Sequence, residues 1–170
     1  MKFFFLLFIS VLFLACSSDE VTKRAIAYND AIVTEQNNIV ARIVDMSNAL
    51  SNPNLSEMYR IKIIDQCDKS IGLVSKMESF EGDLAMRDAA LDLFRFYREI
   101  AANDFKVILE IYALPELGES DYRRLYELEE EISMREELFD LGLKKAQKGF
   151  SDKYNLTLQR NEQQDLVEGN

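Results

Sequence analysis

The sequence predicts an all-α fold, an antiparallel up-down-up-down four-helix bundle of long helices. Apolar side chains recur every three or four residues over four long stretches, which is the spacing of one face of an α-helix. Glycine and proline, which interrupt helices, are sparse, with six and two in 170 residues. The links between the four stretches are short, and short links make consecutive helices antiparallel neighbours.

The first predicted helix spans residues 21–50. Gln36 is the single polar member of its predicted inner face, which otherwise consists of Ala25, Tyr28, Ile32, Ile39, Ile43, Met46 and Leu50. We expect this helix to end before Asn52, because a residue that precedes a proline, here Pro53, is disfavoured in the helical conformation. We expect Asn54 to be the N-cap of the second helix, with Glu57 three residues later completing a capping box.

The second predicted helix runs to about residue 79. Its apolar positions at helical spacing are Met58, Ile61, Ile64, Cys67, Ile71, Val74 and Met77. Cys67 is a member of this apolar face, and free cysteine is among the residues most often buried. We therefore expect Cys67 to be a core residue rather than a reactive thiol.

The third predicted helix is a single element, residues 84–112, with Asp83 as its cap. Its apolar face carries Leu84, Leu91, Phe94, Tyr97, Ala101, Phe105, Ile108 and Tyr112.

The fourth predicted helix is capped by Ser120. Its apolar face carries Tyr122, Leu125, Leu128, Ile132, Phe139, Leu143, Ala146 and Phe150. Glu131 and Arg135, spaced i and i+4, are expected to form an ion pair on its solvent-facing side. The predicted bundle therefore covers residues 21–160, and residues 161–170, which have no apolar face, are expected to form a flexible polar tail.

The N-terminus has the layout of a secretory signal. Lys2 is followed by an apolar run over residues 3–14 and then by Ala15 and Cys16. This run is too short for a membrane-spanning helix, which needs about 20 residues. We interpret residues 1–15 as a removed signal peptide and residues 16–20 as a lipidated tether.

The residues Phe13-Leu14-Ala15-Cys16 resemble the lipobox of bacterial lipoprotein precursors. The resemblance implies that the Cys16 thiol receives a diacylglyceryl group and that its new amino group is acylated, for example with palmitate. The membrane, contacted through this lipid, would then be one partner of the protein. Ser17 resembles the residue found there in outer-membrane lipoproteins, so we expect the outer rather than the inner membrane of the envelope. The sequence is compatible with both a periplasmic location and display at the cell surface.

The mature part resembles a family of small helical surface lipoproteins of the leptospiral type. The segments that carry the resemblance are residues 27–33, with sequence AYNDAIV, and residues 150–156, with sequence FSDKYNL. The resemblance implies placement on an outer surface and brings no assigned activity.

Composition argues against several classes of function. A formal net charge of −10 opposes nucleic-acid binding, because phosphate would be repelled. The sequence has no histidine, which removes the common triads and zinc sites, and it offers no cofactor motif. An acidic run could in principle bind a divalent cation, but we interpret it as a solvated face and assign no metal: Glu127, Glu129, Glu130, Glu131, Glu136, Glu137 and Asp140.

Two hypotheses for function follow from these features. The first is a non-catalytic binding or structural module with an unknown protein partner, and its candidate partner surface is Tyr112, Tyr122 and Tyr126, whose rings could equally line the core. The second is a ligand carrier or enzyme that uses carboxylates and tyrosines in the bundle interior. The predicted inner faces are almost entirely apolar, which favours the first.

Overall fold

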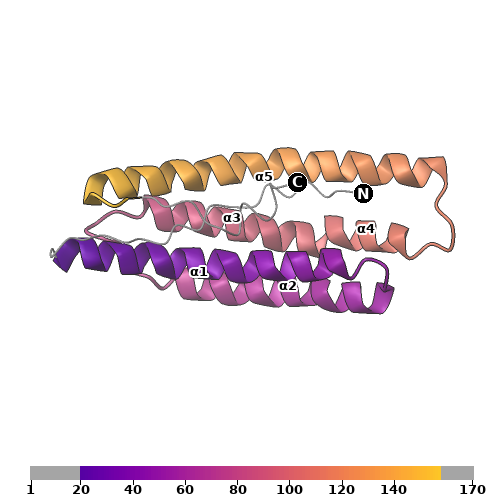
Figure 1. Ribbon diagram of the computed structural model, residues 1–170, viewed down its shortest axis with the longest axis horizontal. Coiled ribbons are helices and arrows are strands. Elements are labelled where there is room, and N and C mark those ends of the chain that lie inside the picture. Colours follow the sequence, from indigo (N-terminus) through magenta and orange to yellow (C-terminus); the bar gives the residue numbers. More distant parts are fainter. Residues whose placement is uncertain (1–19, 158–170) are drawn as a thin grey trace.

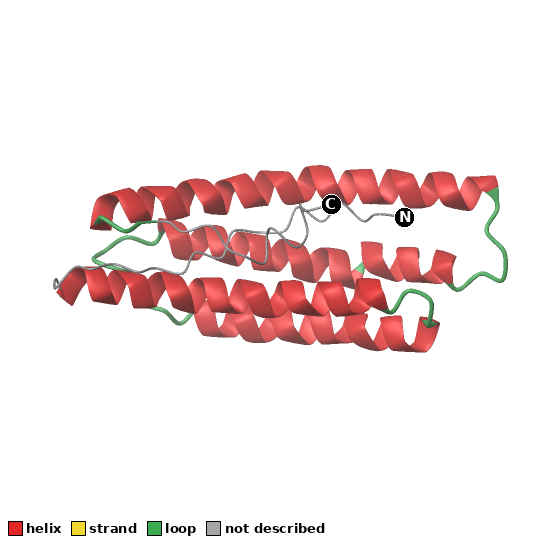
Figure 2. Cartoon of the chain, viewed as in Figure 1, coloured by secondary structure: helices red, strands yellow, loops and turns green. Residues whose placement is uncertain are grey.

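The computed structural model describes residues 20–157, and every regular element in this part of the chain is an α-helix (Figures 1 and 2). The helices are α1 (Glu20–Asn48), α2 (Pro53–Val74), α3 (Ala85–Ala102), α4 (Asp104–Tyr112) and α5 (Glu119–Tyr154). The all-α prediction is therefore confirmed. The predicted signal peptide, Cys16 and the polar tail lie outside the described residues.

The central element is α3. It lies between α5 and the pair formed by α1 and α2, and it contacts all three (Figure 1). α4 follows α3 and packs on α2 and α5. The largest fully buried side chains concentrate on α3 and α4, and they include Phe94, Phe96, Tyr97, Ile100, Phe105 and Ile108. The predicted inner faces of the first and third helices are thus largely confirmed.

The prediction of one helix over residues 84–112 is wrong, because the helix is interrupted at Asn103. Asn103 has φ −113° and ψ −71°, and Asp104 begins the next helix. Asparagine and aspartate are weak helix formers because their side chains compete for backbone hydrogen bonds. Arg135 of α5 spans the break, pairing with Glu99 at 2.6 Å and with Asp104 at 3.4 Å. This is also why Arg135 does not make the expected pair with Glu131.

The start and end of α2 differ from the prediction. Asn52, not Asn54, is the N-cap, since its side chain accepts a hydrogen bond from the Leu55 N–H at 3.2 Å. Pro53 occupies the first helical position, where its missing N–H costs nothing. Glu57 forms no capping box and instead pairs with Arg60 at 2.7 Å. The helix ends at Val74 rather than near residue 79.

The predicted inner face of α2 is wrong in its first half. Met58 and Ile61 are 39% and 48% exposed, whereas the buried positions are Ser56, Arg60, Ile63, Cys67, Ser70 and Val74. Burial of these polar groups is tolerated because they are hydrogen bonded. The Arg60 guanidinium donates to the Ala101 carbonyl at the end of α3, at 2.8 Å, and the Ser70 hydroxyl donates to Glu35 at 2.7 Å.

The start of α5 also differs from the prediction. Gly118 is the N-cap, its N–H donates to the Asp121 carboxylate at 2.9 Å, and the expected cap Ser120 lies within the first turn. At the start of α3 the N-cap is Leu84 rather than the expected Asp83, although the Asp83 carboxylate accepts a hydrogen bond from the Ala85 N–H at 3.0 Å. Among residues 20–157, no helix combines the length and apolar character needed to cross a membrane.

A tight turn over residues 80–83 ties the α2–α3 link to the rest of the molecule. Phe80 and Asp83 exchange two backbone hydrogen bonds, and the central residues Glu81 and Gly82 have φ values of 49° and 81°. The Phe80 ring packs in an aromatic cluster with Tyr28 of α1 and with Phe150 and Tyr154 of α5. This cluster anchors the turn against the first and last helices.

Candidate functional site

Helix α5 exposes five large apolar side chains, two in its first turns and three on its outer face. These are Tyr122, Tyr126, Met134, Leu138 and Leu141, and Leu138 is the most exposed at 71%. The burial of Tyr122 predicted from the sequence is wrong, since that side chain is 54% exposed. Exposed apolar side chains that recur along one helix are typical of contact surfaces.

The three tyrosines of the candidate partner surface lie close to the α4–α5 link. Tyr112 is the last residue of α4 and is half-buried, whereas Tyr122 and Tyr126 are exposed on the first turns of α5. Burial raises the pKa of the Tyr112 hydroxyl, and the neighbouring Glu129 and Tyr122 raise it further. The three tyrosines therefore flank the α4–α5 link.

The inner face of α5 buries two members of the acidic run, so the interpretation of that run as a wholly solvated face is wrong. Glu136 and Asp140 are each only 3% exposed, and Glu129 is half-buried. The expectation of almost entirely apolar inner faces is wrong here too.

The Glu136 carboxylate is hydrogen bonded to Tyr97 of α3. The Tyr97 hydroxyl, itself fully buried, donates to Glu136 Oε1 at 2.8 Å. The pKa of the Glu136 carboxyl is raised to about 7, because burial, with a smaller contribution from the nearby Asp140, outweighs the lowering effect of the Tyr97 hydrogen bond. Burial together with this carboxylate also raises the pKa of Tyr97 well above its ordinary value. The pair can therefore hold or release one proton near neutral pH.

Two further polar contacts lie on the inner faces of α1 and α5. Asp140 pairs with Lys144 at 2.7 Å, while its Oδ1 atom is buried without a hydrogen-bond partner among the described residues. The Gln147 amide donates to Asn29 Oδ1 of α1 at 2.8 Å. Gln36 of α1, one heptad after Asn29, is 2% exposed, and its Nε2 likewise has no partner there. Such atoms carry a desolvation cost unless something hydrogen bonds to them.

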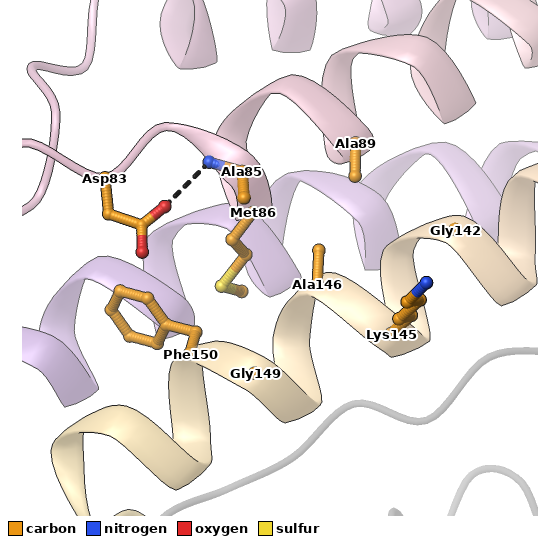
Figure 3. A pocket seen from close by; sticks show the side chains of 9 residues that line it. All are labelled: Asp83, Ala85, Met86, Ala89, Gly142, Lys145, Ala146, Gly149 and Phe150. Carbon is orange, nitrogen blue, oxygen red and sulfur yellow. Dashed lines mark hydrogen bonds between the residues drawn. The ribbon is translucent and has the colours of Figure 1, made fainter.

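A groove of about 510 Å³ lies between α3 and α5 (Figure 3). Small residues form much of its wall, namely Ala85, Ala89, Gly142, Ala146 and Gly149. Asp83 and Lys145 are its charged members, and neither Glu136 nor Tyr97 lines it. The groove therefore gives no access to the buried carboxylates.

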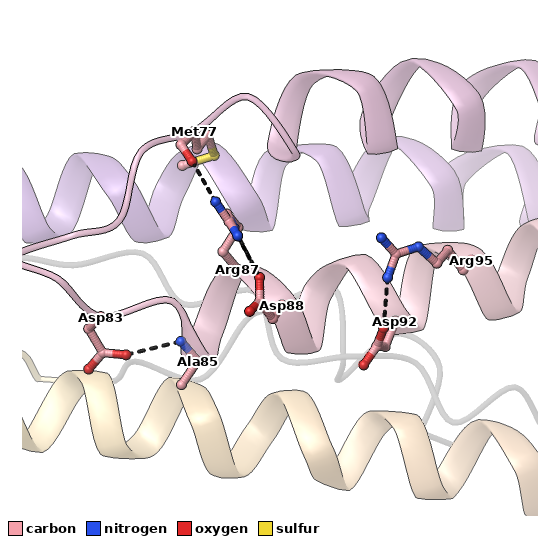
Figure 4. Close-up of polar contacts among 7 residues, drawn as sticks. All are labelled: Met77, Asp83, Ala85, Arg87, Asp88, Asp92 and Arg95. Carbon is pink, nitrogen blue, oxygen red and sulfur yellow. Dashed lines mark hydrogen bonds and ion pairs between the residues drawn. The ribbon is translucent and has the colours of Figure 1, made fainter.

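The polar contacts beside this groove fasten the link between α2 and α3 (Figure 4). The Arg87 guanidinium donates to the Met77 carbonyl at 3.0 Å and pairs with Asp88 at 2.9 Å. Figure 4 also shows Arg95 paired with Asp92 one turn along α3. Arg87 and Arg95 are therefore paired within the protein, and Arg87 in addition holds the α2–α3 link against α3.

Cys67 is fully buried on α2, as the sequence predicted. Burial raises the pKa of its thiol to about 12, with a smaller contribution from Asp68. A thiol that stays protonated is a poor nucleophile. Within residues 20–157, no group of three or more aspartate, glutamate, cysteine or histidine residues is placed to hold a metal ion.

The sequence did contain a signal for the buried carboxylates. The predicted inner face of α5 jumps seven residues from Ile132 to Phe139, and this gap leaves one helical turn without an apolar side chain. Glu136, four residues after Ile132, fills that position. An acidic residue at a gap in the apolar face was therefore the sequence feature that could have identified Glu136 as buried.

Comparison with protein-family models, curated proteins and solved structures found no match to this chain.

Proposed function

We propose that the protein is a lipid-anchored component of the bacterial cell envelope that acts as a non-catalytic binding or structural module. The anchor would be the lipid on Cys16, and the membrane would be the outer rather than the inner one. The contact surface would be the outer face of α5, together with the tyrosines at its N-terminal end.

We also propose that the helices form an antiparallel up-down-up-down four-helix bundle, in which α3 and α4 together act as the third helix. The packing of α1 on α2, of α2 on α3 and of α3 on α5 follows the order of the chain. The links are short, which favours antiparallel neighbours. Such a bundle offers long, continuous helix faces to a partner.

The single observation that carries the binding proposal is the exposure of Tyr122, Tyr126, Met134, Leu138 and Leu141 on one helix. Tyrosine supplies rigid apolar area together with a hydrogen-bonding group, and it is enriched at protein contacts. Leaving several such side chains in water gives no benefit to folding, whereas covering them with a partner removes apolar area from water.

Site-specific photo-crosslinking in cells tests the binding surface. A photoreactive amino acid would replace Tyr126 in one strain and Asp92 in a control strain, because Asp92 is similarly exposed, at 60%, but lies on α3. We expect covalent protein adducts from position 126 and none from position 92. Equal adducts from both positions, or none from either, would contradict the proposed surface.

Metabolic labelling with a radioactive fatty acid tests the anchor. We expect the parent chain to incorporate the label and Cys16→Ser to lose it. Equal labelling of the two chains would overturn lipidation at this residue. Protease treatment of intact cells then separates cell-surface display from a periplasmic location, since only a displayed domain would be cut.

The buried polar groups favour one second candidate, a ligand carrier or enzyme with its site in the interior. The Tyr97–Glu136 pair supplies a titratable group near neutral pH. In antiparallel helices, Gln36 and Asp140 would fall in the same layer, one heptad from the Asn29–Gln147 contact. Their unpartnered atoms would then face a common space. Native mass spectrometry of the full chain tests this candidate, because a bound small molecule that is lost in Asp140→Asn would support it.

A further inference from the structure

The centre of the outer face of α5 consists of three apolar residues at coiled-coil spacing. Met134, Leu138 and Leu141 stand at positions i, i+4 and i+7, and they are 58%, 71% and 54% exposed. The alternation of four and three residues is that of the a and d positions of a heptad. On a helix of 3.6 residues per turn, these three positions lie opposite the buried residues Ile132, Glu136 and Leu143.

Charged residues lie on either side of these three apolar residues. Glu127, Glu130 and Glu131 lie towards the N-terminus, together with Arg123 and Arg124, while Lys145 and Lys148 lie towards the C-terminus and are followed by Asp152. Glu131 lies seven residues before Leu138, and Lys145 lies seven residues after it. Seven residues are close to two helical turns, so both lie near the same side of the helix as Leu138, about 10 Å from it.

This pattern complements itself when one copy is turned end for end. Around a two-fold axis at Leu138, Glu131 of each copy faces Lys145 of the other, so two opposite-charge pairs flank a shared apolar centre. In a parallel arrangement, by contrast, Glu131 would face Glu131 and Lys145 would face Lys145. Complementary charges fix register and orientation at an interface, and juxtaposed like charges oppose it.

We propose that the outer face of α5 binds the same face of a second copy of this chain, antiparallel about a two-fold axis at Leu138. The inference rests on the proposed binding function and names its partner. A two-fold axis makes the contact isologous, so the patch must complement itself, which this one does. Glu131 and Lys145 make no ion pair within 4 Å among the described residues, so both side chains are available for the contact.

A disulfide at the two-fold axis tests the geometry. In the proposed dimer the two copies of residue 138 meet, so Leu138→Cys in the full chain should form a disulfide-linked dimer in intact cells after mild oxidation. Asp92→Cys, which is exposed on α3, is the matched control, and the parent chain sets the background. Cys67 is buried and should not contribute.

Charge exchange in the Leu138→Cys background tests the orientation. Glu131→Lys alone and Lys145→Glu alone each place like charges opposite one another twice, and each should lower the dimer fraction about fivefold. The double variant restores opposite charges and should restore the dimer. Circular dichroism of each purified full chain checks that the helices persist, so a loss of dimer reports the contact rather than the fold.

Three outcomes would overturn the proposal. The first is disulfide formation by Leu138→Cys at no more than the level of Asp92→Cys. The second is equal dimer fractions in the single and double charge variants. The third is photo-adducts from position 126 that contain a different protein while Leu138→Cys stays monomeric. In that last case the binding function would stand and its partner would not be a second copy.

Discussion

Replacing Glu136 by glutamine should stabilise the protein at high pH and leave it nearly unchanged at low pH. Glutamine keeps an oxygen that can accept the Tyr97 hydrogen bond but carries no charge. In the folded chain, burial raises the pKa of the Glu136 carboxyl from its ordinary value near 4.5 to about 7. The charged form is therefore disfavoured by about 3 kcal/mol in the native state relative to the unfolded chain.

The sign of this effect fixes the pH window. Below about pH 4.5 the carboxyl is protonated in both states and imposes no penalty, and as the pH rises through about 7 the native state loses the stability that protonation supplied. We therefore expect Glu136→Gln to exceed the parent in free energy of unfolding by about 1–3 kcal/mol near pH 8 and by less than about 0.5 kcal/mol near pH 4.

Urea unfolding of both chains at a series of pH values measures this difference. Asp140 also has a raised pKa, but it is present in both proteins, and most of its contribution cancels in the comparison. Glu130→Gln is the matched control, because that carboxylate is exposed on the same helix. A difference between parent and Glu136→Gln that stays constant from pH 4 to pH 8 would refute a desolvated, titrating carboxyl at this position.

Three further substitutions have expected costs that urea unfolding can check. Phe105→Ala removes a ring that is 1% exposed and should lower the free energy of unfolding by about 3–5 kcal/mol. The exposed control Glu130→Ala should lower it by less than about 0.5 kcal/mol, and similar costs for the two variants would mean that Phe105 is not a core residue. Gly82→Ala meets no atom within 4 Å, so its expected cost of about 1–2 kcal/mol comes from the φ of 81° alone, and a neutral result would mean that this turn conformation is wrong. Asn52→Ala removes the cap of α2 and should cost about 1 kcal/mol, whereas Asn54→Ala should cost less; the reverse order would restore Asn54 as the cap.

The all-α class could be predicted because apolar periodicity reports which side of a helix faces the core. It succeeded for α1, where Ala25, Ile32, Ile39 and Ile43 are buried as expected. It failed for the first half of α2, because apolar periodicity indicates the inner face only where the buried residues are apolar. There the inner face carries Ser56 and Arg60, and the apolar Met58 and Ile61 point towards water.

Burial of Arg60 depends on partners that no local pattern reveals. Glu57 lies one turn away in sequence, but the Ala101 carbonyl lies 41 residues away at the end of α3. Carbonyls in the last turn of a helix lack intrahelical partners and favour a nearby cation. The side of α2 that faces the core is thus set in part by a long-range contact, which the spacing of apolar residues does not reveal.

The middle of α5 departs from the usual distribution of side chains between the inside and the outside of a helical protein. Its inner face holds Glu136 and Asp140 at 3% exposure, whereas its outer face holds Leu138 at 71%. Exchanging the polarity of these positions would suit an isolated chain better, because each buried carboxyl carries a desolvation cost and the exposed leucine removes little apolar area from water. Stability of the single chain therefore does not account for Leu138. A contact that covers the outer face would account for it, and the opposite charges of Glu131 and Lys145, seven residues on either side of Leu138, indicate which surface that contact would fit.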